Sequence, residues 1–231
     1  MKIIKYLQLP VKFSAPRLRE ELEHISGEQW LAHYQTSQYR GNWTAIPLRS
    51  VGGEIDIRIA PTDDAVYHDT VFLNTANYTK EVLSWFRCPL NAVRLLRLGA
   101  GAEILEHKDA GLNFESGEVR IHIPVTTHSD VEFYIQEERI MMNEGECWYM
   151  NVNLPHAVHN KSDVDRVHLV IDAVVNDWLR ECFSQEGINK KEVEEYDDNT
   201  RKAIIGNLRS LNTETSNRLA DEMEQAAESQ P

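Results

Sequence analysis

Residues 93–106 read VRLLRLGAGAEILE, two short apolar runs separated by a turn that holds Gly99 and Gly101. Similar runs continue to residue 175, and clusters of Gly, Asn, Asp or Ser separate them. They are VRIHIPV (119–125), VEFYIQ (131–136), ECWYMNV (146–152) and RVHLVIDAVV (166–175). Many short strands at this spacing are typical of a β-sandwich or jelly roll. The sequence therefore predicts a mainly β protein whose sheets enclose a pocket.

The segments on either side of this β region have helical patterns. Residues 16–25 (PRLREELEHI) have the apolar spacing of a surface helix. Residues 177–231 carry 13 Asp or Glu against 7 Lys or Arg, a net charge of −6, and both WLRECF and EVEEYDDNTRKAIIGNLRSLN are typical of helices. We therefore expect a main domain over 1–176 and an acidic helical extension over 177–231.

Composition excludes several classes of protein. The 231 residues are 42% hydrophobic and 26% charged, which is ordinary for a chain with a full core. The net charge of −13 argues against nucleic acid and against an anionic membrane surface as partners. The three cysteines form no C-x-x-C pair, and no apolar run has the length of a signal or membrane segment. These features predict a cytoplasmic protein, and the helical extension suits a homodimer contact.

The residues directly after the opening stretch are His107-Lys108-Asp109. In an extended segment His107 and Asp109 lie on the same face, because side chains alternate with a period of two. His156 follows 49 residues after His107 (156 − 107). Two imidazoles and one carboxylate can occupy one face of an Fe(II) octahedron and leave the other face open for a bidentate co-substrate and dioxygen. The pattern predicts that His107, Asp109 and His156 bind iron.

The distal histidine has an alternative. In Pro155-His156-Ala157-Val158-His159-Asn160, the two histidines are three residues apart, so in an extended segment they point to opposite faces. At most one of them can bind the metal. We favour His156, because the strand that begins after Gly145 is expected to end near Pro155 and because His156 with Asn160 has the spacing of the second cupin motif.

Arginine and histidine residues on two strands suit an anionic co-substrate. Arg166 lies ten residues beyond His156 (166 − 156), and its planar guanidinium could meet the far carboxylate of 2-oxoglutarate with two parallel hydrogen bonds. Arg120 and His122 alternate with aliphatic residues on one strand, as Arg166 and His168 do on another. Burying such groups is costly without a partner, and a bound dicarboxylate would be one; a solvent-exposed face is the alternative.

Aromatic residues are concentrated in WLAHYQTSQYRGNWTAIPL (30–48). Core packing is the ordinary interpretation, especially for Trp30. Tyr39 and Trp43, which flank Arg40-Gly41, are candidates for the wall of a substrate pocket. The candidate substrate-binding residues are therefore Trp43 and two charged residues, Arg40 and Glu118.

The segments HKD (107–109), GEVRIHIPV (117–125), NEGECWYMNVNLPHAVHN (143–160) and RVHLVID (166–172) resemble the aspartyl/asparaginyl β-hydroxylase family, especially bacterial members that hydroxylate free amino acids such as proline. The W-x-x-H-Y and Y-R-G-N-W-T-A-I-P-L patterns upstream are similar too, so the resemblance spans about residues 28–176.

This resemblance implies a double-stranded β-helix with a cupin-like fold and iron held by His107, Asp109 and His156. It implies that Arg166 binds the far carboxylate of 2-oxoglutarate and that Arg120 and His122 lie near the keto-acid end. The implied reaction consumes O2, releases succinate and CO2, and hydroxylates an unactivated C–H bond.

Two positions depart from the pattern of the animal members, which act on peptidyl aspartate. Those enzymes lack the carboxylate ligand, whereas this chain has Asp109 at that position. Related halogenases also lack the carboxylate, because chloride takes its coordination site, so Asp109 counts against halogenation. They carry a substrate-binding arginine where this chain has Glu118. The expected substrate is therefore a small amino acid or a derivative. A peptidyl or carrier-tethered residue and a cupin-like metal protein that is not an oxygenase are the alternatives.

Overall fold

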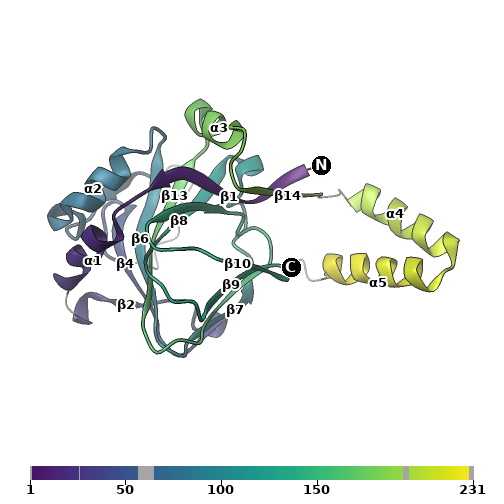
Figure 1. The fold of residues 1–231 in the computed structure, drawn as a ribbon, viewed down its shortest axis with the longest axis horizontal. Helices are drawn as coiled ribbons and strands as arrows, with labels where there is room; N and C mark the ends of the chain where they lie inside the picture. The colour runs from purple at the N-terminus through teal and green to yellow at the C-terminus, as the bar shows by residue number, and fades with distance from the viewer. Residues whose placement is uncertain (1, 26, 57–64, 195–197, 229–231) are drawn as a thin grey trace. The chain divides into compact units, whose positions relative to one another are not determined.

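The computed structural model describes residues 2–25, 27–56, 65–194 and 198–228, without the side chains of 198, 222 and 225–228. Its contacts divide the chain into a large unit, Ile4–Lys191, and a small unit formed by Met1–Ile3 and Glu192–Pro231. The large unit contains the two sheets and three α-helices drawn in Figure 1.

The larger sheet is antiparallel and contains the long strands. Its order includes β1-β11-β8-β13-β6-β4-β2, with β5 beside β4. The strands are β1 (Lys2–Lys12), β2 (Leu31–Ala32), β4 (Trp43–Val51), β5 (Tyr67–Asp69), β6 (Leu90–Leu98), β8 (Glu118–Thr126), β11 (Glu146–Met150) and β13 (Arg166–Val174). The predicted turn at Gly99 and Gly101 connects β6 to a strand of the other sheet.

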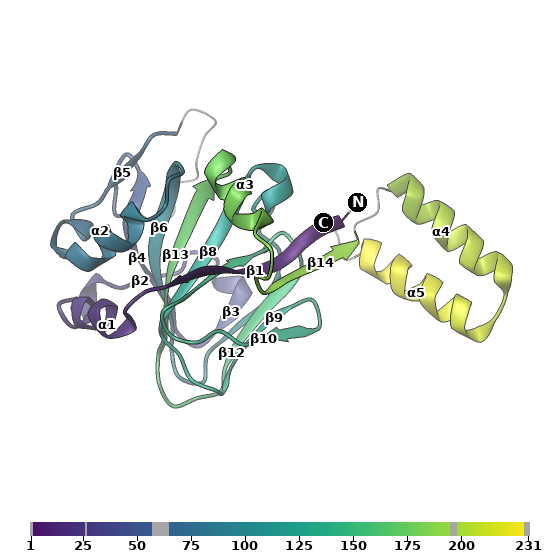
Figure 2. The same ribbon diagram turned by 45° about the horizontal axis from the view of Figure 1, so that its top comes forward.

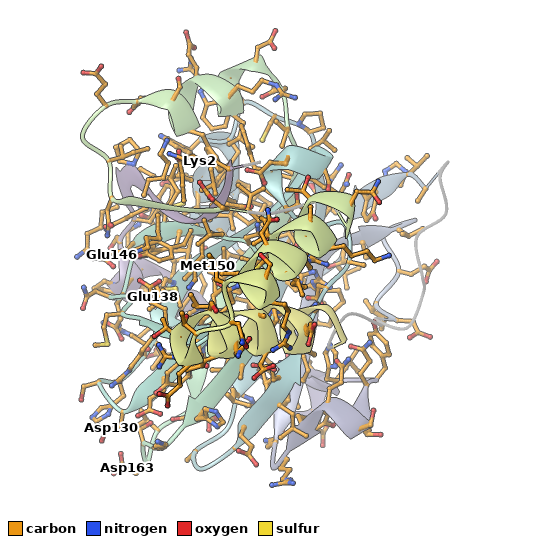
Figure 3. The ribbon with its side chains drawn as sticks, turned by 90° about the vertical axis from the view of Figure 1, so that its right-hand side faces the viewer. Lys2, Asp130, Glu138, Glu146, Met150 and Asp163 are labelled. Carbon is orange, nitrogen blue, oxygen red and sulfur yellow. The ribbon has the colours of Figure 1, made fainter. Side chains whose placement is uncertain are left out.

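The smaller sheet has the order β10-β9-β12-β7-β3 and is also antiparallel. Its strands are β3 (Tyr39–Arg40), β7 (Glu103–His107), β9 (Val131–Ile135), β10 (Glu138–Ile140) and β12 (His156–Asn160). Asp130 and Asp163 mark the β8–β9 and β12–β13 loops, which lie at the same end of the sandwich (Figure 3). Two packed antiparallel sheets confirm the predicted jelly roll.

The larger sheet is buried on both faces, and each face has a different core. Alternate residues of β8 and β13, such as Ile121, Ile123, Leu169 and Ile171, belong to a core that includes residues of three helices. These helices are α1 (Ala15–Glu23), α2 (Asn77–Ser84) and α3 (Asp177–Ser184), shown in Figure 2. The residues between them, including Arg120, His122, Arg166 and His168, face the smaller sheet. The strand period of two thus separates an apolar core from a polar cavity.

Several short segments connect or follow these strands. Single 3-10 turns occur at Gly27–Gln29, Thr36–Gln38, Leu73–Thr75 and Phe114–Ser116. Gly145 must be glycine, because its φ is +78° and a Cβ there would lie 2.2 Å from the carbonyl oxygen of Phe13. This residue turns the chain into β11, as the sequence predicts.

The chain divides after Lys191 rather than after residue 176. The reason is α3, whose residues Leu179, Cys182 and Phe183 are buried in the helix-covered core of the large unit. Residues 192–194, which we expected to be helical, belong to strand β14 (Lys190–Glu194). Residues 195–197 of the same predicted helix lie outside the described residues.

In the small unit, α4 (Asp198–Leu211) and α5 (Glu214–Glu228) form a helical hairpin, as Figures 1 and 2 show. Arg209 of α4 binds Asp221 and Glu224 of α5 at 2.6 and 2.8 Å. Throughout the described part of the chain, the helices are too short or too polar to cross a bilayer.

Candidate metal and co-substrate site

His107, Asp109 and His156 come together between the sheets. His107 ends β7, and His156 begins β12 directly opposite it in the antiparallel register. Asp109 lies two residues beyond β7, where its backbone N–H donates to the carbonyl oxygen of Val152 at 2.8 Å. One donor atom from each side chain lies within 4.8 Å of the others. The sequence pattern alone could propose the three residues, but only strand pairing places them together.

The hydrogen bonds of both histidines leave the same nitrogen free. His107 Nδ1 lies 2.8 Å from the carbonyl oxygen of Leu105, and His156 Nδ1 lies 3.0 Å from that of Leu154. A carbonyl oxygen only accepts, so each Nδ1 carries the proton and each Nε2 has a free lone pair. Backbone bonds of this kind orient metal-binding histidines. With one carboxylate, this donor set fits a divalent metal such as Fe(II).

Asp109 is held in its ionised form. Burial raises the pKa of this carboxyl, but nearby positive charge, above all that of the Arg120 guanidinium, outweighs burial, and the net pKa is below the ordinary value. Arg120 Nη1 donates to Asp109 Oδ2, while Oδ1 lies 3.9 Å from His107 Nε2. One oxygen is therefore occupied by Arg120 and the other faces the histidines.

A cavity of about 90 Å³ connects this triad to Arg166. The Arg166 side chain is only 2% exposed, and no carboxylate lies within ion-pair distance of it among the residues that the structure describes. Its Nε is buried without a hydrogen-bond partner, as is Nε2 of His122, which lines the same cavity. Burial alone lowers the pKa of Arg166 to about 9, so the group remains a cation at neutral pH. A buried unpaired cation favours an anionic ligand.

Aromatic rings form another wall of the cavity. The Trp43 side chain, 6% exposed, stacks on His33 with 3.5 Å between ring centroids and lies 6.4 Å from the ring of His107. Phe133 is parallel to His156 at 6.3 Å. Burial and the neighbouring Arg94 lower the pKa of His33 to about 4, so its ring is neutral. Trp43 therefore lies where a substrate wall was expected, and Tyr39 packs behind it at 5.5 Å.

A second cavity of about 430 Å³ adjoins the first and shares Tyr34, Arg94, Asp109 and Arg120 with it. Arg94 and Arg120 both donate to buried Asp172, which accepts from Arg120 Nε at 2.7 Å and Nη2 at 3.0 Å. Glu118 also lines this cavity and accepts from Asn91 Nδ2. Arg120 thus bridges Asp172 and Asp109 instead of having a free guanidinium.

Not every candidate residue reaches these cavities. Arg40 lies on β3 with a 76% exposed side chain that pairs with Glu103 at 3.0 Å. His159, the alternative to His156, also pairs with Glu103, at 3.1 Å, and is not part of the triad. The two cavities take in Trp43, Glu118, Arg120, His122 and Arg166.

Sequence reasoning missed Arg94, Asp172 and His33. The period of two that placed Arg166 and His168 on one face of β13 also places Asp172 there, and the register pairs Asp172 with Arg120. Arg94 also alternates with aliphatic residues along β6, which is the same kind of signal. His33 is the histidine of the W-x-x-H-Y pattern, but that pattern gave it no role; it reaches the cavity through the packing of irregular chain near Trp43.

Residues 12–175 match the family model described as aspartyl/asparaginyl beta-hydroxylase. The chain belongs to this family. Over 164 residues it is 27% identical to L-proline cis-4-hydroxylase of Rhizobium meliloti (strain 1021). That match covers 70% of this chain and 58% of the relative, so the chain spans little more than half the length of this curated hydroxylase. The resemblance expected from the sequence is confirmed at the level of the family.

One solved structure has a fold similar to that of this chain. The 2OG-Fe(II) oxygenase family oxidoreductase from Burkholderia pseudomallei is 14% identical, with a TM-score of 0.52, and the match covers 74% of this chain and 85% of that structure. At this identity the likeness concerns the fold alone, and it agrees with the predicted jelly roll.

Proposed function

We propose that this protein is an Fe(II)- and 2-oxoglutarate-dependent oxygenase that hydroxylates an unactivated C–H bond of a small amino acid or a derivative. The balanced reaction converts the C–H compound, 2-oxoglutarate and O2 into the hydroxylated compound, succinate and CO2. The observation that carries the proposal is one cavity that contains both the convergent triad and the buried, unpaired Arg166. Family membership and the name of the proline hydroxylase relative support it.

In this proposal each side chain has a separate task. His107, Asp109 and His156 would hold iron, which when bound supplies the activation of O2 that the side chains themselves lack. Arg120 keeps Asp109 ionised and fixes the carboxylate orientation. Arg166 binds the far carboxylate of 2-oxoglutarate, and His122 lies beside the same cavity. Trp43 and Phe133 exclude water next to the two histidines.

The second cavity is the proposed substrate site. Arg94 and Arg120 share the single carboxylate of Asp172 once Asp109 is bound to the metal, which leaves an excess of one positive charge. Glu118 places a carboxylate on the wall of the same cavity. An amino acid in its zwitterionic form has the complementary pair of charges. We therefore propose that its carboxylate faces the arginines and that its ammonium group faces Glu118.

We also propose that this protein belongs to the branch of the family that hydroxylates free amino acids and that it is cytoplasmic. All three cysteines, Cys88, Cys147 and Cys182, are free thiols, which suits a reducing compartment. A small-molecule substrate would bind within the large unit, where all the site residues lie.

Equilibrium binding tests the assignment before any turnover. Under anaerobic conditions, protein stripped with a chelator should bind one Fe(II), and the loaded protein should then bind 2-oxoglutarate. Asp109→Ala and His156→Ala should each weaken iron binding at least tenfold, whereas His159→Ala, on the same strand, should bind iron as the wild type does. Iron binding that survives both Asp109→Ala and His156→Ala, or that is lost in His159→Ala, would overturn the assigned triad.

A further inference from the structure

Arg166, His168 and His122 form a buried row that the proposed reaction leaves partly unexplained. Arg166 and His168 lie on the same face of β13, and His122 lies on the neighbouring strand β8. Arg166 Nη2 is 2.8 Å from His168 Nδ1, which is 3.4 Å from His122 Nδ1. The exposed fractions of Arg166, His168 and His122 are only 2%, 1% and 5%. Solvent therefore does not supply the hydrogen bonds of this row.

The chemistry of arginine fixes the direction of these bonds. A guanidinium has N–H donors and no acceptor, so His168 Nδ1 must accept from Arg166 and its proton must be on Nε2. His122 Nδ1 can then face the same nitrogen only as a donor. Burial, followed by the charge of Arg166, lowers the pKa of His168 well below its ordinary value, in agreement with a neutral ring.

A neutral acceptor differs from the usual partner of a buried arginine. A carboxylate such as Asp172, which binds both Arg94 and Arg120, holds a guanidinium and also offsets its charge. His168 can hold Arg166 in one orientation while the full positive charge remains available. The unpartnered Nε of Arg166 shows that this guanidinium still has an unused donor.

We propose that His168 is a positioning residue, which orients the Arg166 guanidinium for the far carboxylate of 2-oxoglutarate by accepting one hydrogen bond without neutralising it. The inference rests on the proposed function and assigns to His168 a role in co-substrate affinity that acts only through Arg166. The effect of His168 on ligand affinity must therefore depend on whether the ligand has a far carboxylate.

Two ligands and two variants test this dependence. Dissociation constants of 2-oxoglutarate and of pyruvate, a 2-oxo acid without the far carboxylate, are measured on anaerobic Fe(II)-loaded protein from the visible absorption of the metal-bound keto acid. His168→Leu removes the acceptor within a similar volume and should weaken 2-oxoglutarate about tenfold or more. Pyruvate affinity should change less than about twofold. His168→Gln, whose side-chain oxygen can accept, should recover most of the 2-oxoglutarate affinity.

Several results would overturn the inference. Unchanged 2-oxoglutarate affinity in His168→Leu would show that Arg166 is oriented without His168. Equal weakening of both ligands, or the same loss in His168→Gln as in His168→Leu, would assign His168 a general structural role. If the wild-type protein binds pyruvate and 2-oxoglutarate with equal affinity, the role of Arg166 in the proposed function fails as well, which is distinguishable from the failure of His168 alone.

Discussion

Asp172 is the carboxylate that two arginines share in the proposed substrate cavity. It is 6% exposed and accepts hydrogen bonds from both Arg94 and Arg120, which it holds beside the candidate metal site. Asp172→Asn would keep the shape and remove the charge, leaving Arg94 without its carboxylate partner and Arg120 with Asp109 alone. Removing one partner of a buried ion pair costs about 3–5 kcal/mol. We expect a loss of this size in the free energy of unfolding, measured by urea titration at pH 7.

Asp163→Asn is the matched control for this prediction. Asp163 is an exposed carboxylate in the β12–β13 loop, at the end of the sandwich seen in Figure 3. We expect a change within about 0.5 kcal/mol, as for most surface substitutions. Equal unfolding curves for Asp172→Asn and Asp163→Asn would show that Asp172 does not stabilise the arginine pair.

Glu118 tests the proposed orientation of the substrate. If its carboxylate binds the ammonium group, Glu118→Gln should raise the KM for the amino acid about tenfold, because a hydrogen bond to a charged group contributes about 1.5–3 kcal/mol. The KM for 2-oxoglutarate should not change, since Glu118 lines only the second cavity. Steady-state kinetics with each compound varied in turn gives both values. Glu137→Gln, in an exposed turn, is the control, and a KM for the amino acid unaffected by Glu118→Gln would exclude the contact.

The candidate site could be predicted to the extent that it follows strand periodicity. His107, Asp109, His122 and Arg166 were identified from spacing and from resemblance, and the structure brings them around one cavity. Arg40 was chosen for its proximity to Trp43 in sequence, but it follows Tyr39 on β3, and successive residues of a strand point to opposite faces. Tyr39 packs against the buried Trp43, whereas the Arg40 side chain is exposed.

At the scale of elements, β8 and β13 explain how polar residues are kept inside the sandwich. Both strands alternate between the helix-covered apolar core and the cavity, so a single strand positions Arg166 and His168 while Leu169 and Ile171 stabilise the sheet. This alternation is visible in the sequence. What it cannot specify is which face is covered, because a polar face suits solvent as well as a cavity.

Burial of His122 and His168 on these strands predicts a pH dependence of stability. Burial lowers the pKa of both rings well below the ordinary value of 6.5. Below pH 6.5 the unfolded chain therefore binds protons that the folded chain does not, and stability, which is full above about pH 7, falls as the pH decreases. Each of these two histidines should lower the free energy of unfolding by about 1.4 kcal/mol as the pH falls from 7.5 to 5.5.

His168→Gln removes one of these groups. In metal-free protein, the loss of unfolding free energy between pH 7.5 and 5.5 should be smaller in this variant by about 1.4 kcal/mol. Urea titrations at the two pH values give the difference, and His24→Gln, at an exposed helix end, should behave as the wild type. A variant that loses as much stability as the wild type would mean that His168 is protonated in the folded protein.

Element boundaries were less accessible from the sequence than element types. Residues 192–194 belong to β14 although EVEEYDD has good helix formers, because helix propensity contributes little compared with strand pairing. Helix α3 was correctly expected, but its burial in the main core is a tertiary property that the amphipathic pattern does not specify.

For the whole molecule, the division after Lys191 separates the proposed chemistry from the helical hairpin. All candidate metal, co-substrate and substrate residues lie within Ile4–Lys191. We expect a chain shortened after Lys191 to bind Fe(II) and 2-oxoglutarate within about twofold of the full chain, as measured by anaerobic titration. Loss of binding in a shortened chain that remains folded by circular dichroism would assign the hairpin a part in the site.

The most direct test of the central claim is succinate formation by the full, Fe(II)-loaded protein supplied with 2-oxoglutarate, ascorbate and air. A panel of free L-amino acids is added singly, with proline included, and Asp109→Ala serves as the control. The account predicts that at least one amino acid raises succinate formation, with hydroxylated product in equal amount, and that the control forms neither. No consumption of 2-oxoglutarate by protein shown to hold iron would contradict the account.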